Sequence, residues 1–190
     1  IESILNQKFK NWNLILVDDK STDNTLKVVK LFHSKKINIY SLKKHVGRTN
    51  ALNYGLKKCN GEFVAILDAD DLCNKNRLME QVNFLQKNRK FKMVGSWAIK
   101  VDQFKKKIGE IKISNLPPSK NISLLLGQQF IPHSTLMFCL SHARKYGGYP
   151  SDLKYAQDFG LILQFIKKNK LYILPKFLTK IRVLSDSMSF

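Results

Sequence analysis

Acidic residues are scarce in this 190-residue sequence, which holds 14 Asp and Glu against 33 Lys and Arg and has a formal net charge of +19. Long apolar runs are also missing, since none approaches the about 20 residues that a transmembrane helix needs. The three cysteines, Cys59, Cys73 and Cys139, are widely spaced and odd in number. They argue against a disulfide framework and a zinc knuckle, and they favour a reducing cytosol.

Arginine is scarce too, because only five of the 33 basic residues are Arg and these five are scattered through the chain. Proteins that read nucleic-acid bases or phosphates favour the forked guanidinium group. The charge therefore predicts no nucleic-acid partner, and a nucleic-acid-binding module ranks third among the alternatives. A basic surface still favours anionic substrates and an anionic membrane leaflet.

The residues that are present predict one globular α/β domain, with 44% hydrophobic residues and a length that suits a single core. In the first half, strand and helix patterns alternate. Strands are expected at 13–19, 37–42 and 61–68, and helices at 22–34, 47–59 and 74–88. This order predicts a mostly parallel central sheet with helices on both faces.

The second half has a different pattern, with less regular alternation. Strands are expected at 92–102, 107–114 and 133–139, a short helix at 122–129, a glycine-rich loop at 146–152, a helix at 155–168 and two short closing strands. This half is expected to form a smaller region beside the main sheet.

Half of the scarce acids are concentrated, since seven of the 14 lie in three short stretches: Asp18, Asp19 and Asp23; Asp68, Asp70 and Asp71; Asp158. Two of these stretches end predicted strands, and ligands gather at the carboxyl ends of parallel strands. Clustered carboxylates repel one another and resist burial, so folding alone does not explain them. Oxygen ligands suit Mg²⁺ or Mn²⁺, held by one or two carboxylates together with substrate phosphates.

Ordinary structural roles compete with this interpretation at several positions. Asp23 suits a helix cap, and Asp158 precedes an apolar helix, where any Asp is favoured. Gly47 and Arg48 fit an anion site at a helix N-terminus, but they fit a plain helix start equally well. His133 fits a satisfied structural histidine at least as well as a substrate contact.

Taken together, the motifs resemble the family 2 glycosyltransferases, an inverting family with the GT-A fold. The matching stretches follow the family's order: "SILNQKFKNWNLILVDDKSTDNT", "GRTNALNYGLKKCNGEFVAILDADDL", "RLMEQV", "HSTLMF", "GGY", "AQDFGLIL" and "IRVLSDSMS". The resemblance implies a Rossmann-like GT-A sheet and transfer of a sugar from a nucleotide-sugar, with Mn²⁺ or Mg²⁺ as cofactor.

The resemblance also implies roles for individual residues. Asp18 matches the acid that contacts the donor base, and Asp68 matches the position near the ribose. Asp70 matches the ligand of the divalent metal that bridges the diphosphate, and Arg48 lies where a basic residue neighbours that diphosphate. Asp158 matches the general base.

The sequence departs from the family pattern in three places. The first strand of the family would precede Ile1, so one side of the base pocket is expected to be absent. Gln157 replaces the Glu of the family's Glu-Asp pair, and Leu184 stands where many members have a metal-binding His. On the acceptor side, His133, Gly148 and Gln157 are candidate contacts.

Residues 1–102 are thus expected to bind the nucleotide-sugar and residues 103–190 the acceptor, as two halves of one domain. The expected reaction moves a sugar from a UDP-sugar to the hydroxyl of a glycan or glycolipid, such as a lipopolysaccharide or other surface-polysaccharide precursor. The expected place is the cytoplasm, with peripheral attachment to the inner face of the cell membrane. The main alternative is a receiver-like phosphoacceptor signalling domain, which "LILVDD" imitates. Receivers, however, end with Lys–Pro, and here the order is Pro175–Lys176.

Overall fold

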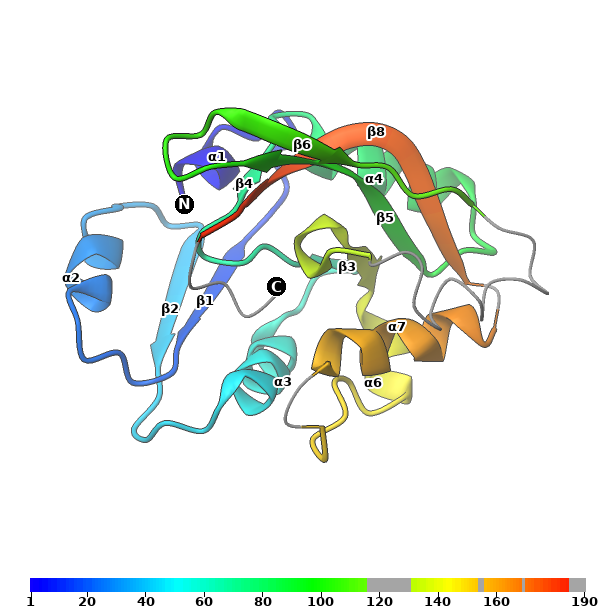
Figure 1. Cartoon of the computed structure of the whole chain (residues 1–190). Coiled ribbons are helices and arrows are strands. Elements are labelled where there is room, and N and C mark those ends of the chain that lie inside the picture. The colour runs from blue at the N-terminus through cyan, green and yellow to red at the C-terminus, as the bar shows by residue number, and fades with distance from the viewer. Residues whose placement is uncertain (116–130, 154–155, 169, 185–190) are drawn as a thin grey trace.

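The computed structural model describes residues 1–115, 131–153, 156–168 and 170–184 (Figure 1). The predicted helix at 122–129 lies outside the described residues. Strands β1 (Leu14–Asp18) and β2 (Ile37–Ser41) form a parallel pair, with Leu14 opposite Ile37. Both strands were predicted, and their bounds agree with the prediction to within one residue.

A six-stranded sheet forms the centre of the molecule, in the order β3-β7-β5-β8-β4, with β6 added to β5. Its strands are β3 (Phe63–Ala65), β4 (Leu72–Cys73), β5 (Met93–Val101), β6 (Lys107–Ile111), β7 (Met137–Cys139) and β8 (Leu171–Arg182). Only β5–β8 pair in parallel here, while β3–β7, β5–β7, β5–β6 and β4–β8 are antiparallel among the described strands.

The α/β class is confirmed, but the sheet is mixed rather than mostly parallel. The expectation came from the alternating first half, where a helix returns the chain between parallel strands. Between β5 and β6 there is only a turn, in which the Asp102 N–H donates to the Lys106 carbonyl at 3.0 Å. So short a connection makes an antiparallel pair.

The described helices are α1 (Glu2–Leu5), α2 (Thr25–Lys30), α3 (Arg48–Lys58), α4 (Arg77–Lys87), α6 (Leu140–Lys145) and α7 (Gln157–Ile166), with a 3-10 turn η3 at His133–Thr135. Helices α3, α4 and α7 confirm predictions, whereas α6 was not predicted. The segment 133–139 was predicted as one strand but begins as η3 and becomes β7 only at Met137. None of the described helices is long and apolar enough to cross a bilayer.

The core has two parts, one on each face of the six-stranded sheet. Neighbouring strand residues alternate between them: Met93 and Ile173 belong to one cluster, and Val94 and Leu174 belong to the other. The first cluster also includes residues of α3, α6 and α7, and the second includes residues of α4. Because successive strand side chains point to opposite faces, this alternation confirms helices on both faces.

Strand β8 is long and strongly bent (Figure 1). Two short strands were predicted here, divided after Pro175, a residue that has no N–H for a ladder. The structure instead has a single strand paired with β5, in which the register jumps from Leu174, opposite Ser96, to Phe177, opposite Trp97. A bulge at the proline thus keeps the strand continuous. The same sheet contains strands from residues 1–102 and strands from residues 103–190. The predicted division into a donor half and an acceptor half would therefore separate functions and not structural units.

Candidate active site

Asp18 ends β1 and is buried, with 3% of its surface exposed. Its carboxylate accepts hydrogen bonds from the Ser41 hydroxyl at 2.9 Å and the Ser21 N–H at 3.2 Å. Burial raises the pKa of Asp18, but the hydrogen bonds from Ser21 and Ser41 outweigh it and leave the pKa below its usual value. The fold therefore holds this carboxylate ionised at the end of the strand.

Asp19 connects β1 to the start of α3. Its carboxylate accepts from the N–H groups of Val46 and Gly47, both at 2.8 Å, and lies 2.8 Å from His45 Nδ1. Gly47 precedes α3 with a φ of +83°, in the region that favours glycine. The carboxylate therefore fixes the loop that delivers Arg48 to the first turn of α3.

Arg48 and Asp68 form the central ion pair of the site. Arg48 Nη2 lies 2.9 Å and 3.0 Å from the two carboxylate oxygens of Asp68. The N–H of Asp68 donates to Ser134 Oγ at 3.0 Å. Burial raises the pKa of Asp68, but His133 and Arg48 more than offset it and lower the pKa to about 2. The structure thus brings the ends of β1 and β3 together through Asp19, Gly47 and Arg48.

His133 lies beside Asp68, and its side chain is buried. Its Nε2 is 2.8 Å from the Tyr149 hydroxyl, whereas its Nδ1 is 3.6 Å from Asp68 Oδ1, too far for a hydrogen bond. Nδ1 has no hydrogen-bond partner among the described residues. His133 was expected on the acceptor side, and it lies beside Asp68, which was expected near the donor ribose.

Tyr149 links the two groups of predicted site residues. Its main chain is held by Asn53, whose amide accepts from the Tyr149 N–H at 2.9 Å and donates to its carbonyl at 2.8 Å. Burial raises the pKa of the Tyr149 hydroxyl well above its ordinary value, and the charges of Asp68 and Asp158 raise it further. Both carboxylates therefore act on one buried phenol, although they are 90 residues apart in the chain.

Asp158 lies in the first turn of α7 and is half-buried. Its Oδ1 accepts from the Phe159 N–H at 2.8 Å. The loop before α7 is attached to the first turn of α3, because Thr49 Oγ1 donates to the Leu153 carbonyl at 3.2 Å. This attachment brings the start of α7 to the end of the sheet where Arg48 lies. The carboxylate can cap its own helix and also point one oxygen toward a ligand.

The two other acceptor-side candidates occupy tightly packed positions. Gly148 has a φ of +76°, and a side chain there would meet Asn53 Oδ1 at 2.6 Å. Its carbonyl accepts from Gln164 Nε2 at 3.0 Å. Gln157 is buried, with 8% of its surface exposed. The close packing of Gly148 and the burial of Gln157 are typical of structural residues, and their acceptor-side role stays a prediction.

The three carboxylates of the "DADD" stretch, Asp68, Asp70 and Asp71, lie in three different environments. Asp70 is exposed and makes no hydrogen bond or ion pair with the described residues, while Asp71 is buried and accepts from the Arg182 N–H at 2.9 Å. Burial raises the pKa of Asp71 to about 6, and the charges of Asp70 and Asp68 contribute. Asp71 is thus a structural residue at this turn, and Asp70 is the carboxylate that remains available.

A divalent metal was expected at this turn. No group of three or more His, Cys, Asp or Glu side chains in the described part of the chain is arranged to hold one. The available Asp70 does fit the way in which Mg²⁺ is usually bound, through one or two carboxylates and the oxygens of a substrate phosphate. The residues therefore fit a metal that arrives with a diphosphate, and they do not form a complete metal site by themselves.

Arg77 is a supporting residue that the sequence interpretation missed. It is buried, and its Nη2 donates to the carbonyls of Ile66 at 2.8 Å and Leu136 at 3.0 Å. Its Nε donates to Gln81 Oε1 at 3.1 Å. Arg77 thereby joins the chain that leads into "DADD" to the chain that leads into β7. The sequence pattern that could have identified Arg77 is its spacing from Gln81 and Leu85, which places the arginine on the buried face of α4.

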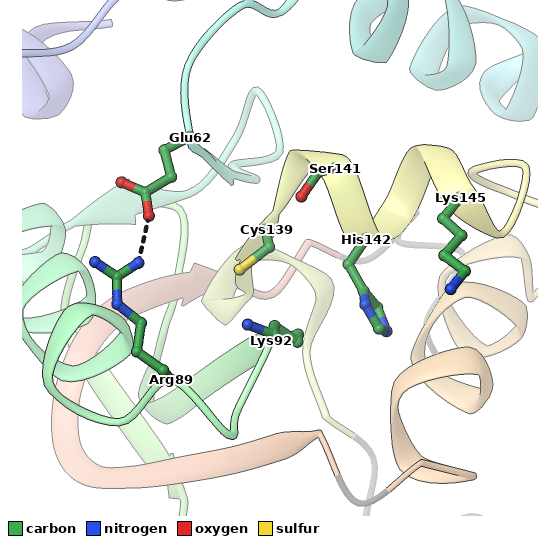
Figure 2. Close-up of a pocket in the computed structure, with 7 residues that line it drawn as sticks. All are labelled: Glu62, Arg89, Lys92, Cys139, Ser141, His142 and Lys145. Carbon is green, nitrogen blue, oxygen red and sulfur yellow. Dashed lines mark hydrogen bonds and ion pairs between the residues drawn. The ribbon is translucent and has the colours of Figure 1, made fainter.

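A hollow of about 350 Å³ lies elsewhere, at the opposite end of β3 (Figure 2). Glu62, which immediately precedes β3, is part of its lining, whereas Asp68 follows that strand. The hollow is therefore not part of the acidic site.

Comparisons with known proteins identify the family of the chain. The family model "Glycosyl transferase family 2" matches residues 1–145, which is more than half of the chain. The chain belongs to glycosyl transferase family 2. Both acidic strand ends that suggested a receiver domain lie inside the matched segment. The proposed base, Asp158, lies beyond it.

Among the similar curated proteins, one is aligned over nearly the whole chain and another over about half of it. The putative glycosyltransferase EpsE of Bacillus subtilis is 34% identical over 193 residues, covering 98% of this chain and 68% of its own length. In Escherichia coli, WfgD, named as a UDP-Glc:alpha-D-GlcNAc-diphosphoundecaprenol beta-1,3-glucosyltransferase, is 36% identical over 99 residues, covering 52% of this chain and 39% of its own length.

Solved structures show the same fold. The S. aureus TarS 1–349 complex with UDP-GlcNAc superposes with a TM-score of 0.76 at 20% identity, over 98% of this chain and 54% of that one. The Pyrobaculum calidifontis mannosyltransferase PcManGT, in complex with GDP-Man and Mn²⁺, superposes with a TM-score of 0.71 at 19% identity, over 97% of this chain and 52% of that one. The chain therefore has the GT-A fold and spans about half the length of these structures.

Proposed function

We propose that this chain carries the donor and acceptor sites of an inverting glycosyltransferase that moves a sugar from a UDP-sugar to an acceptor hydroxyl. The observation that carries the proposal is the Arg48–Asp68 ion pair, which joins the first turn of α3 to the segment after β3. Asp18 lies at the end of β1, Asp70 is exposed two residues after Asp68, and Asp158 lies in the first turn of α7. Family membership supplies the reaction class.

On the donor side, Asp18 receives the base, Asp68 lies near the ribose, and Arg48 lies near the diphosphate. The Arg48–Asp68 ion pair is partly exposed, with side-chain exposures of 44% and 30%. A diphosphate can therefore reach Arg48 without unfolding the site, and Arg48 can share its donors between Asp68 and phosphate oxygens. A Mn²⁺ or Mg²⁺ ion held by Asp70 would neutralise charge on the diphosphate.

On the acceptor side, Asp158 removes the proton from the acceptor hydroxyl as the oxygen attacks the anomeric carbon. Attack from the face opposite the diphosphate inverts the configuration at that carbon. The Phe159 N–H fixes Asp158 Oδ1, so the second oxygen is left to take the proton. Such fixed orientation is what a general base needs.

The UDP donor is supported by the printed names of two comparison proteins, WfgD and the TarS complex with UDP-GlcNAc. The complex of PcManGT with GDP-Man makes a GDP-sugar the competing donor. The acceptor that we propose is a glycan or glycolipid of cell-surface polysaccharide synthesis, consistent with the lipid-diphosphate acceptor in the name of WfgD. A cytoplasmic enzyme attached peripherally to the inner leaflet would meet such an acceptor.

The deciding experiment is a screen of UDP- and GDP-sugars for hydrolysis and thermal stabilisation of the protein, with and without Mn²⁺. The proposal expects stabilisation by UDP-sugars that requires the metal. Equal stabilisation by GDP-sugars would reject the donor assignment, and metal-independent binding would reject the role of Asp70. An Asp18→Ala variant that binds UDP as tightly as the wild type would reject the base contact.

A further inference from the structure

The hollow at the other end of β3 is built where several elements of the sheet begin or end (Figure 2). The N–H of Lys92 donates to the Lys170 carbonyl at 2.7 Å, and the N–H of Cys139 donates to the Lys92 carbonyl at 2.8 Å. These bonds join the starts of β5 and β8 to the end of β7. Helix α6 continues directly from β7 and contributes His142 and Lys145 to the lining.

The charges that line this hollow are mostly positive and only partly neutralised. Glu62 lies 2.8 Å from Arg89, so the one carboxylate among the described lining residues already has a partner (Figure 2). Lys92 and Lys145 have no ion pair with a described carboxylate. With Arg89 and Glu62 cancelling each other, the lining keeps two unneutralised ammonium groups.

His142 provides a second, independent observation. Its ring centroid lies 4.9 Å from those of both Tyr146 and Phe165. Its Nε2 is buried and has no hydrogen-bond partner among the described residues. Buried polar atoms are usually paired, and an unpaired one needs an explanation. His142 is only partly buried as a whole and lines the hollow, so a ligand there that accepts a hydrogen bond would supply the partner once the imidazole turns toward it.

We propose that this hollow binds a phosphate group, with Lys92 and Lys145 as its cations and the His142 imidazole as a hydrogen-bond donor. A phosphate dianion would balance the two unneutralised lysines, and phosphate oxygens accept from both ammonium and imidazole N–H groups. Burial lowers the pKa of His142, as do the charges of Lys92, Lys145 and Lys170, and a bound anion would offset those positive charges.

The volume agrees with this ligand class. At about 350 Å³ the hollow lies at the small end of ligand pockets, with room for a phosphate and a small organic group. The site lies before β3 and the proposed donor site lies after it, so the two can be tested separately.

Proton NMR of the histidine rings tests the proposal at constant ionic strength and pH. Titration with inorganic phosphate should shift the His142 signals to saturation, while chloride at the same ionic strength should not. His142→Gln assigns the signals, since the chain has four histidines. A shift that does not saturate, or one that chloride reproduces, would overturn the proposal.

Charge-matched variants separate this site from the general basic surface. Lys92→Met and Lys145→Met should each weaken phosphate binding by about fivefold or more, because each removes a charged contact. The control is Lys27→Met on α2, an exposed lysine whose loss changes the net charge equally. UDP binding should be unchanged in all three variants. Equal weakening of phosphate binding in all three would show a diffuse counterion effect and reject the site.

The source of the phosphate is decided by two further probes, glycerol phosphate and vesicles of phosphatidylglycerol, with phosphatidylcholine vesicles as the blank. Retention on phosphatidylglycerol vesicles that is lost in Lys92→Met identifies a lipid headgroup. Binding of glycerol phosphate without vesicle retention identifies a soluble phosphorylated compound. Either result supports the site, and failure of both probes along with inorganic phosphate would reject it.

Discussion

The two ends of β3 differ in which of their charged side chains have a hydrogen-bond or ion-pair partner. After β3, the scarce carboxylates are mostly partnered: Asp68 by Arg48, and Asp71 by the Arg182 N–H. Only Asp70 is left without a hydrogen bond or ion pair among the described residues of that turn. Before β3, the single acid is partnered and the lysines are not. In both proposals, therefore, the ligand is assigned to the charge that the fold leaves unpartnered rather than to the commonest charge.

The largest expected effect is that of Asp158→Asn at the acidic end. Asn can still accept the Phe159 N–H but cannot take a proton. Sugar transfer should fall by about 10²–10⁴-fold, the usual contribution of a positioned base. Melting temperature and UDP–Mn²⁺ affinity should stay close to those of the wild type. A structural Asp158 would instead give turnover per folded molecule within a few-fold of wild type.

The substitution Gln157→Glu tests the role of Asp158 in a second way, through the pH dependence of the rate. A second carboxylate beside Asp158 should shift the acid limb of the pH–rate profile upward, because like charges favour protonation. Since Gln157 is buried, a loss of stability is also expected and must be measured separately. An unmoved acid limb together with active Asp158→Asn would remove Asp158 from the mechanism.

The next largest effect should come from Arg77, the buried guanidinium that supports the acidic end. Arg77→Met leaves the carbonyls of Ile66 and Leu136 and the Gln81 amide without their donor. We expect a loss of about 2–4 kcal/mol in the free energy of unfolding, measured by urea titration. Arg89→Met at the hollow is the matched control, because its ion pair with Glu62 is exposed and should cost at most about 1 kcal/mol. Similar losses in both variants would contradict this difference between the two ends.

Asp70→Asn tests whether the unpartnered carboxylate is the one that matters. Calorimetry should show UDP affinity in Mn²⁺ reduced by about tenfold or more, with no change when the metal is absent. Folding should be unaffected, since the charge of Asp70 only adds repulsion to Asp71. Glu2→Gln, an exposed carboxylate on α1, is the control and should bind as the wild type does. An unchanged metal dependence in Asp70→Asn would place the ligand elsewhere.

The smallest effect concerns the hydrogen bond from Ser41 to Asp18. The pKa of Asp18 is lowered by folding, so its ionisation stabilises the fold above the unfolded value of 3.8 and this contribution disappears as the pH falls below it. Ser41→Ala should therefore cost about 1 kcal/mol at pH 7 and less at pH 3, measured by urea unfolding. Ser96→Ala is the control, because Ser96 bonds the Trp97 carbonyl and its effect should not vary with pH. A pH-independent loss in Ser41→Ala would argue against the assignment.

Much of this site could be predicted from the sequence because its determinants are local. The apolar run before Asp68 defines a strand, and the acids that follow must lie at its end. Gly47 before a helical pattern marks the start of α3. These short-range rules were sufficient for β1, β2, α3, α4 and α7, whose periodicity is clear.

What could not be predicted depends on contacts between distant segments. The carboxylate of Asp19 accepts from the N–H groups of Val46 and Gly47, which lie 27 and 28 residues further along the chain. Nothing near His133 indicates that it would lie against Asp68 and Tyr149, since the three meet only after β7 is placed between β3 and β5. The antiparallel pairings of β7 arise in the same way, from tertiary packing rather than from local alternation.

Continuity of β8 has a consequence for the order in which the site forms as the protein folds. The Arg182 N–H that holds Asp71 lies 111 residues further along the chain, and β8 pairs with β5 although β6, β7, α6 and α7 lie between these two strands in the sequence. Contacts of such large sequence separation form slowly, because chain entropy is lost before they form. During synthesis, the "DADD" turn thus stays incomplete until the last described strand has left the ribosome. The acidic end of the molecule should consequently be among the last regions to gain protection from hydrogen exchange during refolding.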